Sequence, residues 1–173
     1  MIGALQSTSS IAIWNFGPGG SLLLGVELPC PQIPSFLTVD DADGDGDLDL
    51  LALSYKLQGS SSVFENLGGL SFAAAVDYAV GPYPVAARLI DLDQDGLKDL
   101  VSIDSAFVSD GFERLTLRRG QPGGGFAPAL SFGLGRAPSA LAIEDMDGDS
   151  LPDLVVANSL SRDIWLLPNL LLR

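Results

Sequence analysis

One ten-residue motif constrains this chain more than any other feature. It reads DADGDGDLDL at residues 41–50, DLDQDGLKDL at 91–100 and DMDGDSLPDL at 145–154. In each copy Asp stands at positions 1, 3, 5 and 9, and Leu at position 10. A solvated turn would explain a single copy, because Asp and Gly are ordinary turn residues. Three copies with the same spacing favour a bound cation, since carboxylates packed this closely repel one another.

The ligand chemistry favours Ca²⁺, which takes six to eight oxygens at about 2.3–2.6 Å in flexible geometry. Mg²⁺ fits less well because it keeps several waters, and soft metals are poorly served by a chain without His and with Cys30 alone. We predict three Ca²⁺ sites. The side-chain ligands would be Asp41, Asp43, Asp45 and Asp49; Asp91, Asp93, Asp95 and Asp99; and Asp145, Asp147, Asp149 and Asp153. Position 7 would add a backbone carbonyl from Asp47, Leu97 or Leu151.

An EF-hand is the main alternative for such a loop, and the sequence argues against it. That motif closes with a bidentate Glu at position 12, where this chain has Ala52, Ser102 and Val156. The flanking segments are short apolar runs of strand length rather than helices. Each loop is therefore predicted to be the turn between two strands.

Composition supports a metal-binding protein and argues against a nucleic-acid partner. The net charge is −13, and 13 of the 22 acidic residues lie in the three loops. No basic stripe is present, and no apolar run is long enough to span a membrane. A single cysteine excludes an intrachain disulfide, and MIGALQSTSS does not read as a signal peptide. Because such loops fill where Ca²⁺ is abundant, we expect an extracellular, periplasmic or cell-surface location.

The loops recur at intervals of 50 and 54 residues, which is typical of a repeat array. Between them we expect about fourteen short strands and no helix. We predict an all-β fold: residues 1–173 as a single β-propeller segment of about three to three and a half blades, each of four antiparallel strands. The units would be 1–35 (partial), 36–84, 85–137 and 138–173 (partial). A β-sandwich is the alternative.

Few other residues suggest chemistry. Without His, the usual Ser-His-Asp and Cys-His arrangements are excluded, so we expect no enzyme activity. Trp14 and Trp165 are expected at equivalent strand positions, where they would pack between blades. Tyr83 and Arg136, on connections opposite the loops, are the best candidates for partner contacts. The arginines at 114, 118 and 119 are expected on a solvated outer strand.

The loop pattern, followed by a strand, a Gly-rich hairpin, a Phe and G-x-x-P, resembles FG-GAP/VCBS-type repeats. The resemblance covers nearly the whole chain. It implies calcium-binding propellers such as integrin α-subunit heads, with the metal loops on one face and partner binding mostly on the other. Two departures stand out. Position 6 of the third loop is Ser150 instead of Gly, beside Pro152, which predicts that this site is the weakest. A closed ring also needs four to eight blades.

These features predict a non-catalytic calcium-binding module for protein or glycan binding or adhesion. Both ends of the chain are apolar strands, so we expect a homo-oligomer or further blades of a longer protein to cover them. The alternatives are the propeller part of a secreted polysaccharide-degrading enzyme and a self-assembling structural scaffold.

Overall fold

The computed structural model describes residues 1–105 and 113–169, and these residues form an all-β fold. They contain fourteen strands and one short 3-10 turn, η1 (Pro18–Gly20). The predicted all-β class and the predicted number of about fourteen strands are confirmed. Within the described ranges no helix is both long and apolar enough to cross a membrane.

The strands form four antiparallel sheets in chain order. The first sheet contains β1 (Ile2–Leu5), β2 (Ser10–Phe16) and β3 (Leu22–Pro29). The second contains β4 (Phe36–Asp40), β5 (Asp49–Ser54), β6 (Ser60–Phe64) and β7 (Val76–Ala79). The third contains β8 (Pro84–Ile90), β9 (Asp99–Asp104), β10 (Arg114–Arg118) and β11 (Leu130–Gly133). The fourth contains β12 (Pro138–Glu144), β13 (Asp153–Asn158) and β14 (Asp163–Leu167).

The N-terminal segment forms a three-stranded sheet of its own, one strand short of the four-stranded unit. Its first strand, β1, pairs along its whole length with β2. The described residues therefore hold four sheets of three, four, four and three strands. The four-stranded unit predicted from the sequence occurs in the two middle sheets.

Neighbouring sheets pack face to face through three apolar cores. Along β5, Leu50 and Ala52 face the first sheet, whereas Leu51 and Leu53 face the third. Leu141 and Val156 of the fourth sheet pack against the third in the same way. Because the middle strands are buried on both faces, they read as continuous apolar runs rather than as alternating ones.

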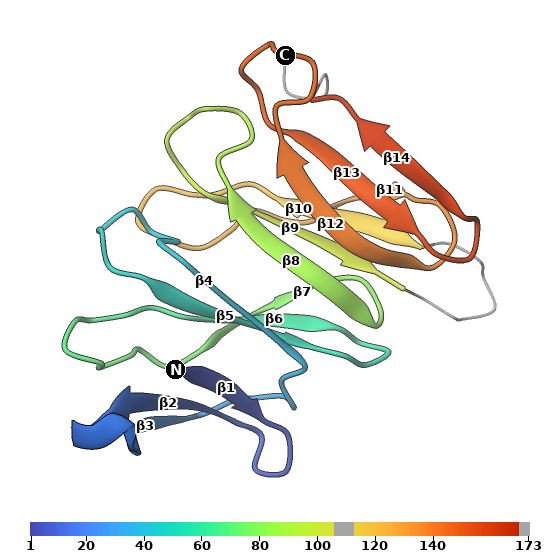
Figure 1. The fold of residues 1–173 in the computed structure, drawn as a ribbon. Helices are drawn as coiled ribbons and strands as arrows, with labels where there is room; N and C mark the ends of the chain where they lie inside the picture. The colour runs from blue at the N-terminus through green and yellow to red at the C-terminus, as the bar shows by residue number, and fades with distance from the viewer. Residues whose placement is uncertain (106–112, 170–173) are drawn as a thin grey trace.

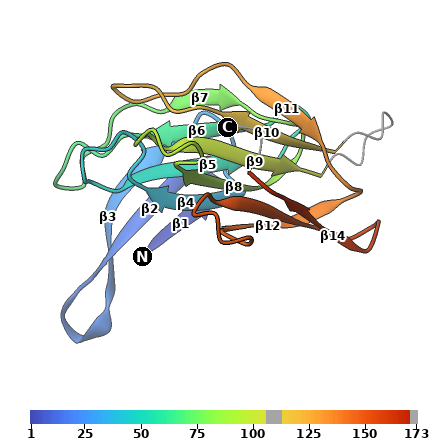
Figure 2. The ribbon, with the colours of Figure 1, turned by 90° about the horizontal axis from the view of Figure 1, so that it is seen from above.

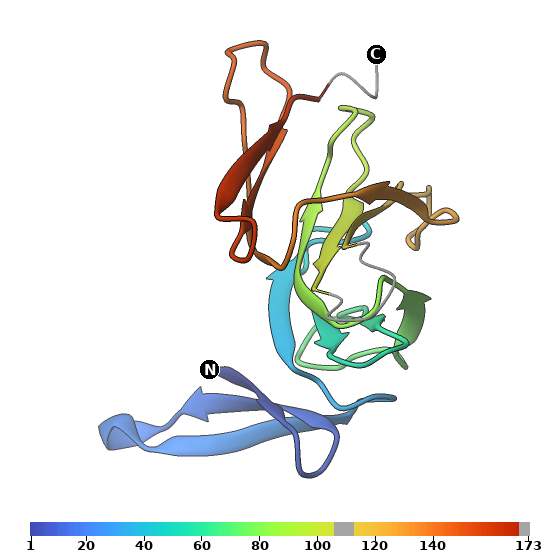
Figure 3. The same cartoon turned by 90° about the vertical axis from the view of Figure 1, so that its right-hand side faces the viewer.

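The four sheets are stacked in an open array (Figure 1), with the first and last sheets at opposite ends (Figure 3). The β2–β3 hairpin, closed by η1, projects away from the other sheets (Figure 2). The array of small antiparallel sheets fits the repeat pattern, and closure into a ring stays a prediction.

The two tryptophans are not at equivalent positions. The turns 6–9 and 159–162 join β1 to β2 and β13 to β14, with Leu5 paired to Ser10 and Asn158 to Asp163. The last turn residue has a positive φ in both, 51° at Ser9 and 60° at Arg162. This register matches Trp14 with Leu167, two residues beyond Trp165.

Candidate metal centres

Each Asp-rich loop connects two consecutive strands of one sheet, as the sequence predicts. The loops join β4 to β5, β8 to β9 and β12 to β13, and Figure 1 places them on the same side of the array. In the second and third sheets, the strand pairing runs up to the position-9 aspartate: Asp40 pairs with Asp49, and Ile90 with Asp99. The strands therefore fix where each loop begins and ends.

The loops bring carboxylates into three tight groups. Within each group the oxygens lie within 4.8 Å of one another. The groups are Asp41, Asp43 and Asp45; Asp91, Asp93 and Asp95; and Asp145, Asp147 and Asp153. Oxygens this close can all reach one ion at a Ca–O distance of about 2.4 Å, so the donor set fits a hard cation. The predicted ligands outside these groups are Asp49, Asp99 and Asp149 and the residues at position 7.

Hydrogen bonds from the backbone hold the carboxylates in place. The position-1 carboxylate accepts from the N–H at position 6, with N–O distances of 3.1 Å for Asp41, 2.9 Å for Asp91 and 2.9 Å for Asp145. The position-5 carboxylate accepts from the N–H at position 7 at 2.8 Å in all three loops, where the donors are Asp47, Leu97 and Leu151. The cluster geometry is thus set by the loop itself.

The position-9 aspartate ties the loop to the outer half of its sheet. Asp49 accepts from the N–H groups of Ala42 and Asn66, both at 2.8 Å. Asp99 and Asp153 accept in the same way, from Leu92 and Gly120 and from Met146 and Asn169. This bracing role was not predicted, because its second donor lies 16 to 21 residues along the chain.

Burial affects these three carboxyls differently. Burial raises the pKa of Asp49 and of Asp99 above the usual value, and neighbouring loop aspartates add to the shift. The pKa of Asp153 is instead lowered, because the N–H groups of Asn169 and Met146 donate to its carboxylate. The first two sites therefore hold a carboxylate whose charged form is disfavoured unless a cation compensates it.

Two loop positions require a left-handed backbone. Position 4 is Gly44, Gln94 or Gly148, and position 6 is Gly46, Gly96 or Ser150; all six have positive φ. Ser150 has φ 71°, as expected for a residue that replaces glycine here. Gln94, with φ 58°, was not singled out from the sequence. Its Nε2 donates to the Ser150 carbonyl at 2.6 Å and joins the second loop to the third.

The residue just after the third strand of each unit differs between the sites. Register matches Glu65 with Arg119 and Pro168, since each precedes the residue whose N–H donates to the position-9 aspartate. The Arg119 guanidinium lies 3.5 Å from the Asp93 carboxylate. At the first site Glu65 lines a pocket together with Asp43 and Asp49.

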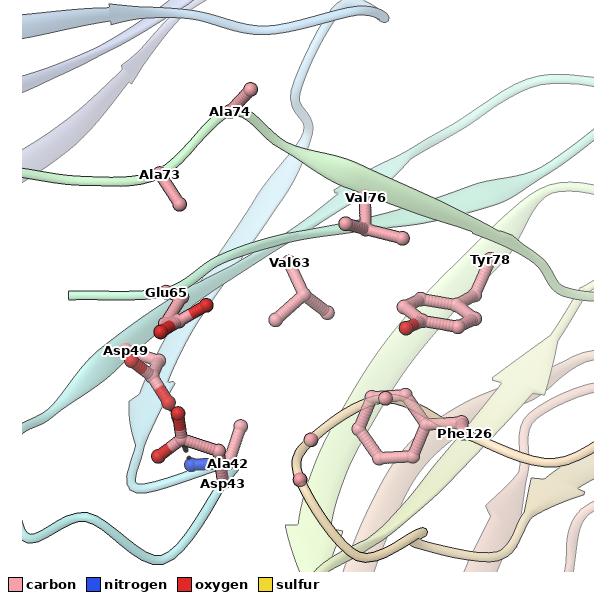
Figure 4. A pocket seen from close by; sticks show the side chains of 13 residues that line it. Ala42, Asp43, Asp49, Val63, Glu65, Ala73, Ala74, Val76, Tyr78 and Phe126 are labelled. Carbon is pink, nitrogen blue, oxygen red and sulfur yellow. Dashed lines mark hydrogen bonds between the residues drawn. The ribbon is translucent and has the colours of Figure 1, made fainter. Parts of the chain in front are cut away.

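That pocket lies between the first loop and the third sheet and has a volume of about 240 Å³. Figure 4 shows Asp43, Asp49 and Glu65 at one end and Tyr78 and Phe126 at the other. The two rings meet edge to face, with centroids 5.0 Å apart. The hairpin that carries Phe126 must approach closely, because a Cβ at Gly125 would lie 2.9 Å from the Tyr78 hydroxyl.

The remaining candidates have structural contacts. Arg118 donates to the carbonyls of Ala79 and Ala127, so the expectation of a purely solvated arginine strand is wrong for it. Tyr83 lies beside the start of β8, at the far end of that strand from the second loop, and its ring is 5.1 Å from that of Tyr55. Arg136 lies two residues before β12. Burial raises the pKa of the Cys30 thiol, which disfavours the reactive thiolate.

Comparison with known families agrees with this geometry. The FG-GAP-like repeat family matches the chain twice, over residues 41–102 and over residues 91–156. Each match starts at a loop aspartate and extends through the next loop. The protein therefore belongs to the FG-GAP-like repeat family. A search of curated proteins found no match.

Proposed function

We propose that this protein is a calcium-binding repeat module whose three loops each hold one Ca²⁺. The observation that carries the proposal is the recurrence of three groups of carboxylate oxygens, each within 4.8 Å. A divalent cation would compensate the charge of each group and hold the two strands that flank it. The ligands would be the position-1, position-3, position-5 and position-9 aspartates with the position-7 carbonyl.

Calorimetric titration of the metal-free protein tests this assignment. We expect three Ca²⁺ per chain, and Asp43→Ala, Asp93→Ala and Asp147→Ala should each remove one. Asp77→Ala is the matched control, because this carboxylate lies on β7 and accepts from Ser62 rather than joining a loop cluster. Full stoichiometry in the three loop variants would contradict the proposal.

We further propose that the module acts outside the cytoplasm as a propeller segment that binds a protein or a glycan. The family match and the array of small antiparallel sheets support the propeller architecture. The edge that carries Tyr55 and Tyr83 is the candidate contact surface, because a paired aromatic surface opposite the loops suits ligand packing. A glycan array probed with the Ca²⁺-loaded protein and with Tyr83→Ala tests this. Binding that is unchanged in Tyr83→Ala would place the contact elsewhere.

A further inference from the structure

The fourth sheet buries one face and leaves the other open. Its inner face packs Leu141 and Val156 against the third sheet. The opposite face presents Ile164 and Leu166, which pair with Ala157 and Val155 on β13. The Ile164 side chain is 71% exposed and that of Leu166 is 48% exposed. Among the described residues, nothing covers this apolar face, which we call the open face of the fourth sheet.

Strand register shows what these positions do in the other sheets. Ile164 occupies the second pair of its hairpin, as Ile11 does in the first sheet, where Ala4 is the partner. Leu115 holds the matching position in the third sheet, opposite Ile103. Ile11 is 0% exposed and Leu115 is 2% exposed, because each faces the next sheet in the array. The open face therefore has the composition of an inter-sheet contact that lacks its partner.

The partner of such a face is also identifiable. Ile11 and Ile13 pack in one core with Phe64 of the second sheet, which is 2% exposed. The β2–β3 and β6–β7 hairpins match over four pairs, which start at Ser10–Pro29 and at Ser60–Ala79; the β2–β3 pairing then shifts register between Ile13 and Trp14. Counting four residues along each strand matches Trp14 with Phe64.

Trp14 thus lies where an aromatic side chain would meet a preceding sheet, and among residues 1–105 and 113–169 no sheet packs on that side. Its ring covers Gly3, since a Cβ at Gly3 would lie 2.9 Å from Trp14 Cζ3. The first sheet also repeats the polar edge of the second. The same register matches Glu27 with Asp77, and each of these carboxylates accepts from a serine hydroxyl of the neighbouring strand. The outer face of the first sheet therefore resembles the face of the second sheet that is buried against the first.

We propose that a second copy of this chain packs its first sheet on the open face of the fourth sheet, with Trp14 of one protomer against Ile164 and Leu166 of the other. The contact is head to tail, so two copies can make it twice. Two chains of four sheets would then close into a ring of eight, within the four to eight blades that propellers use. This contact between chains would be of the same kind as the three apolar cores that join neighbouring sheets within each chain.

Light scattering on the Ca²⁺-loaded protein tests the assembly. We expect a mass twice that of one chain, and at least a tenfold weaker association for Ile164→Glu combined with Leu166→Glu. Leu160→Glu is the matched control, because Leu160 is a 53% exposed residue of the same sheet but lies in the 159–162 turn. A monomeric wild type, masses that keep rising with concentration, or a dimer unaffected by the double change would overturn the proposal.

Complementation tests the head-to-tail pairing. Trp14→Glu alone and the Ile164→Glu/Leu166→Glu variant alone should each be monomeric, but a mixture should form heterodimers through the one intact pair of faces. A mixture that stays monomeric would overturn the pairing. Circular dichroism checks that each variant is folded. If Trp14→Glu unfolds, the Trp165→Phe variant is used instead, because Trp14 is then its single tryptophan. The fluorescence emission of Trp14 should shift to shorter wavelength as the protein associates. Emission that does not change with concentration would contradict the proposal.

These outcomes are separable from the metal proposal. The open face is formed by Ile164 and Leu166, neither of which belongs to a carboxylate cluster. A monomer that still binds three Ca²⁺ would overturn the assembly and leave the calcium sites standing.

Discussion

The first and second loops have the same four aspartates, yet their surroundings differ in charge. At the first loop Glu65 lies beside Asp43 and Asp49. At the second, Arg119 takes the matching position, with its guanidinium 3.5 Å from Asp93. The spacing of the aspartates therefore sets where the carboxylates lie. The net charge that a cation would meet also depends on other loop residues, Asp47 in the first loop and Lys98 in the second, and on the residue that follows the third strand. The two sites should differ in affinity although their loops align without a gap.

The third loop extends this comparison. Pro168 takes the place of Glu65 and Arg119, so the charge contributed at this position runs from negative through positive to neutral along the chain. The sequence alone predicts the third site as the weakest, because of Ser150. From charge alone we instead expect the second site, where Arg119 pairs with Asp93, to be the weakest and the first site to be the tightest.

The largest expected effect is removal of all three cations. At a Ca²⁺ concentration about 100 times Kd, each site stabilises the folded state by about 2.7 kcal/mol. Chelation should therefore lower the melting temperature by more than roughly 10 °C in a chain of this size. A scan in Ca²⁺ and in chelator measures the difference, with Mg²⁺ as the control cation. Identical melting curves would show that the loops are stable without metal.

Within the second loop, Asp95→Ala should destabilise the protein more than Lys98→Ala does. The first change removes a predicted ligand and the acceptor of the Leu97 N–H. The second removes a half-exposed ion pair in which Lys98 Nζ lies 3.7 Å from Asp40. Such pairs contribute about 0–1 kcal/mol. Thermal melts in Ca²⁺ compare the two, and equal melting temperatures would count against a metal at this loop.

Exchanging the flanking charges should reverse the ranking of the first two sites. Arg119→Glu should tighten the second site and Glu65→Arg should weaken the first, each by roughly fivefold to tenfold. That range corresponds to about 1 kcal/mol for unit charges some 4 Å apart in water. Site-resolved calcium titration measures both. Arg114→Glu is the control, because it makes the same charge change at the far end of β10. An equal effect of Arg114→Glu would show that the affinity responds to the net charge of the protein and not to the residue beside the loop.

The smallest expected effect concerns backbone conformation in the third loop. Ser150→Gly should tighten the third site by about threefold, because glycine adopts φ 71° without a Cβ penalty. Gln94→Gly in the second loop removes a similar penalty but also the hydrogen bond to the Ser150 carbonyl. Its net effect should be smaller. A Ser150→Gly affinity equal to wild type would show that the loop carries no strain at this position.

The fold was predictable from the sequence where the signal is local. The Asp spacing placed each loop between two strands, and the repeat period placed the sheets. The charge difference between Glu65 and Arg119 was not predictable, because it depends on which residue the register brings beside Asp43 or Asp93, which lie 22 and 26 residues earlier in the chain. The mismatch of Trp14 and Trp165 has the same origin: two Ile-Trp pairs look alike until the turns 6–9 and 159–162 fix their register. The metal identity itself stays a prediction.

The shared register has a consequence for how such chains change length during evolution. In the middle two sheets, alternate residues of one strand serve the preceding and the following neighbour, as Leu50 and Leu51 do. An in-frame duplication of one period of about 50 residues would join two surfaces that are both already apolar. In-frame duplication or deletion of one period can therefore add or remove a whole sheet without requiring a new kind of contact between sheets. The number of sheets is the property of this lineage that we expect to vary most freely between descendants.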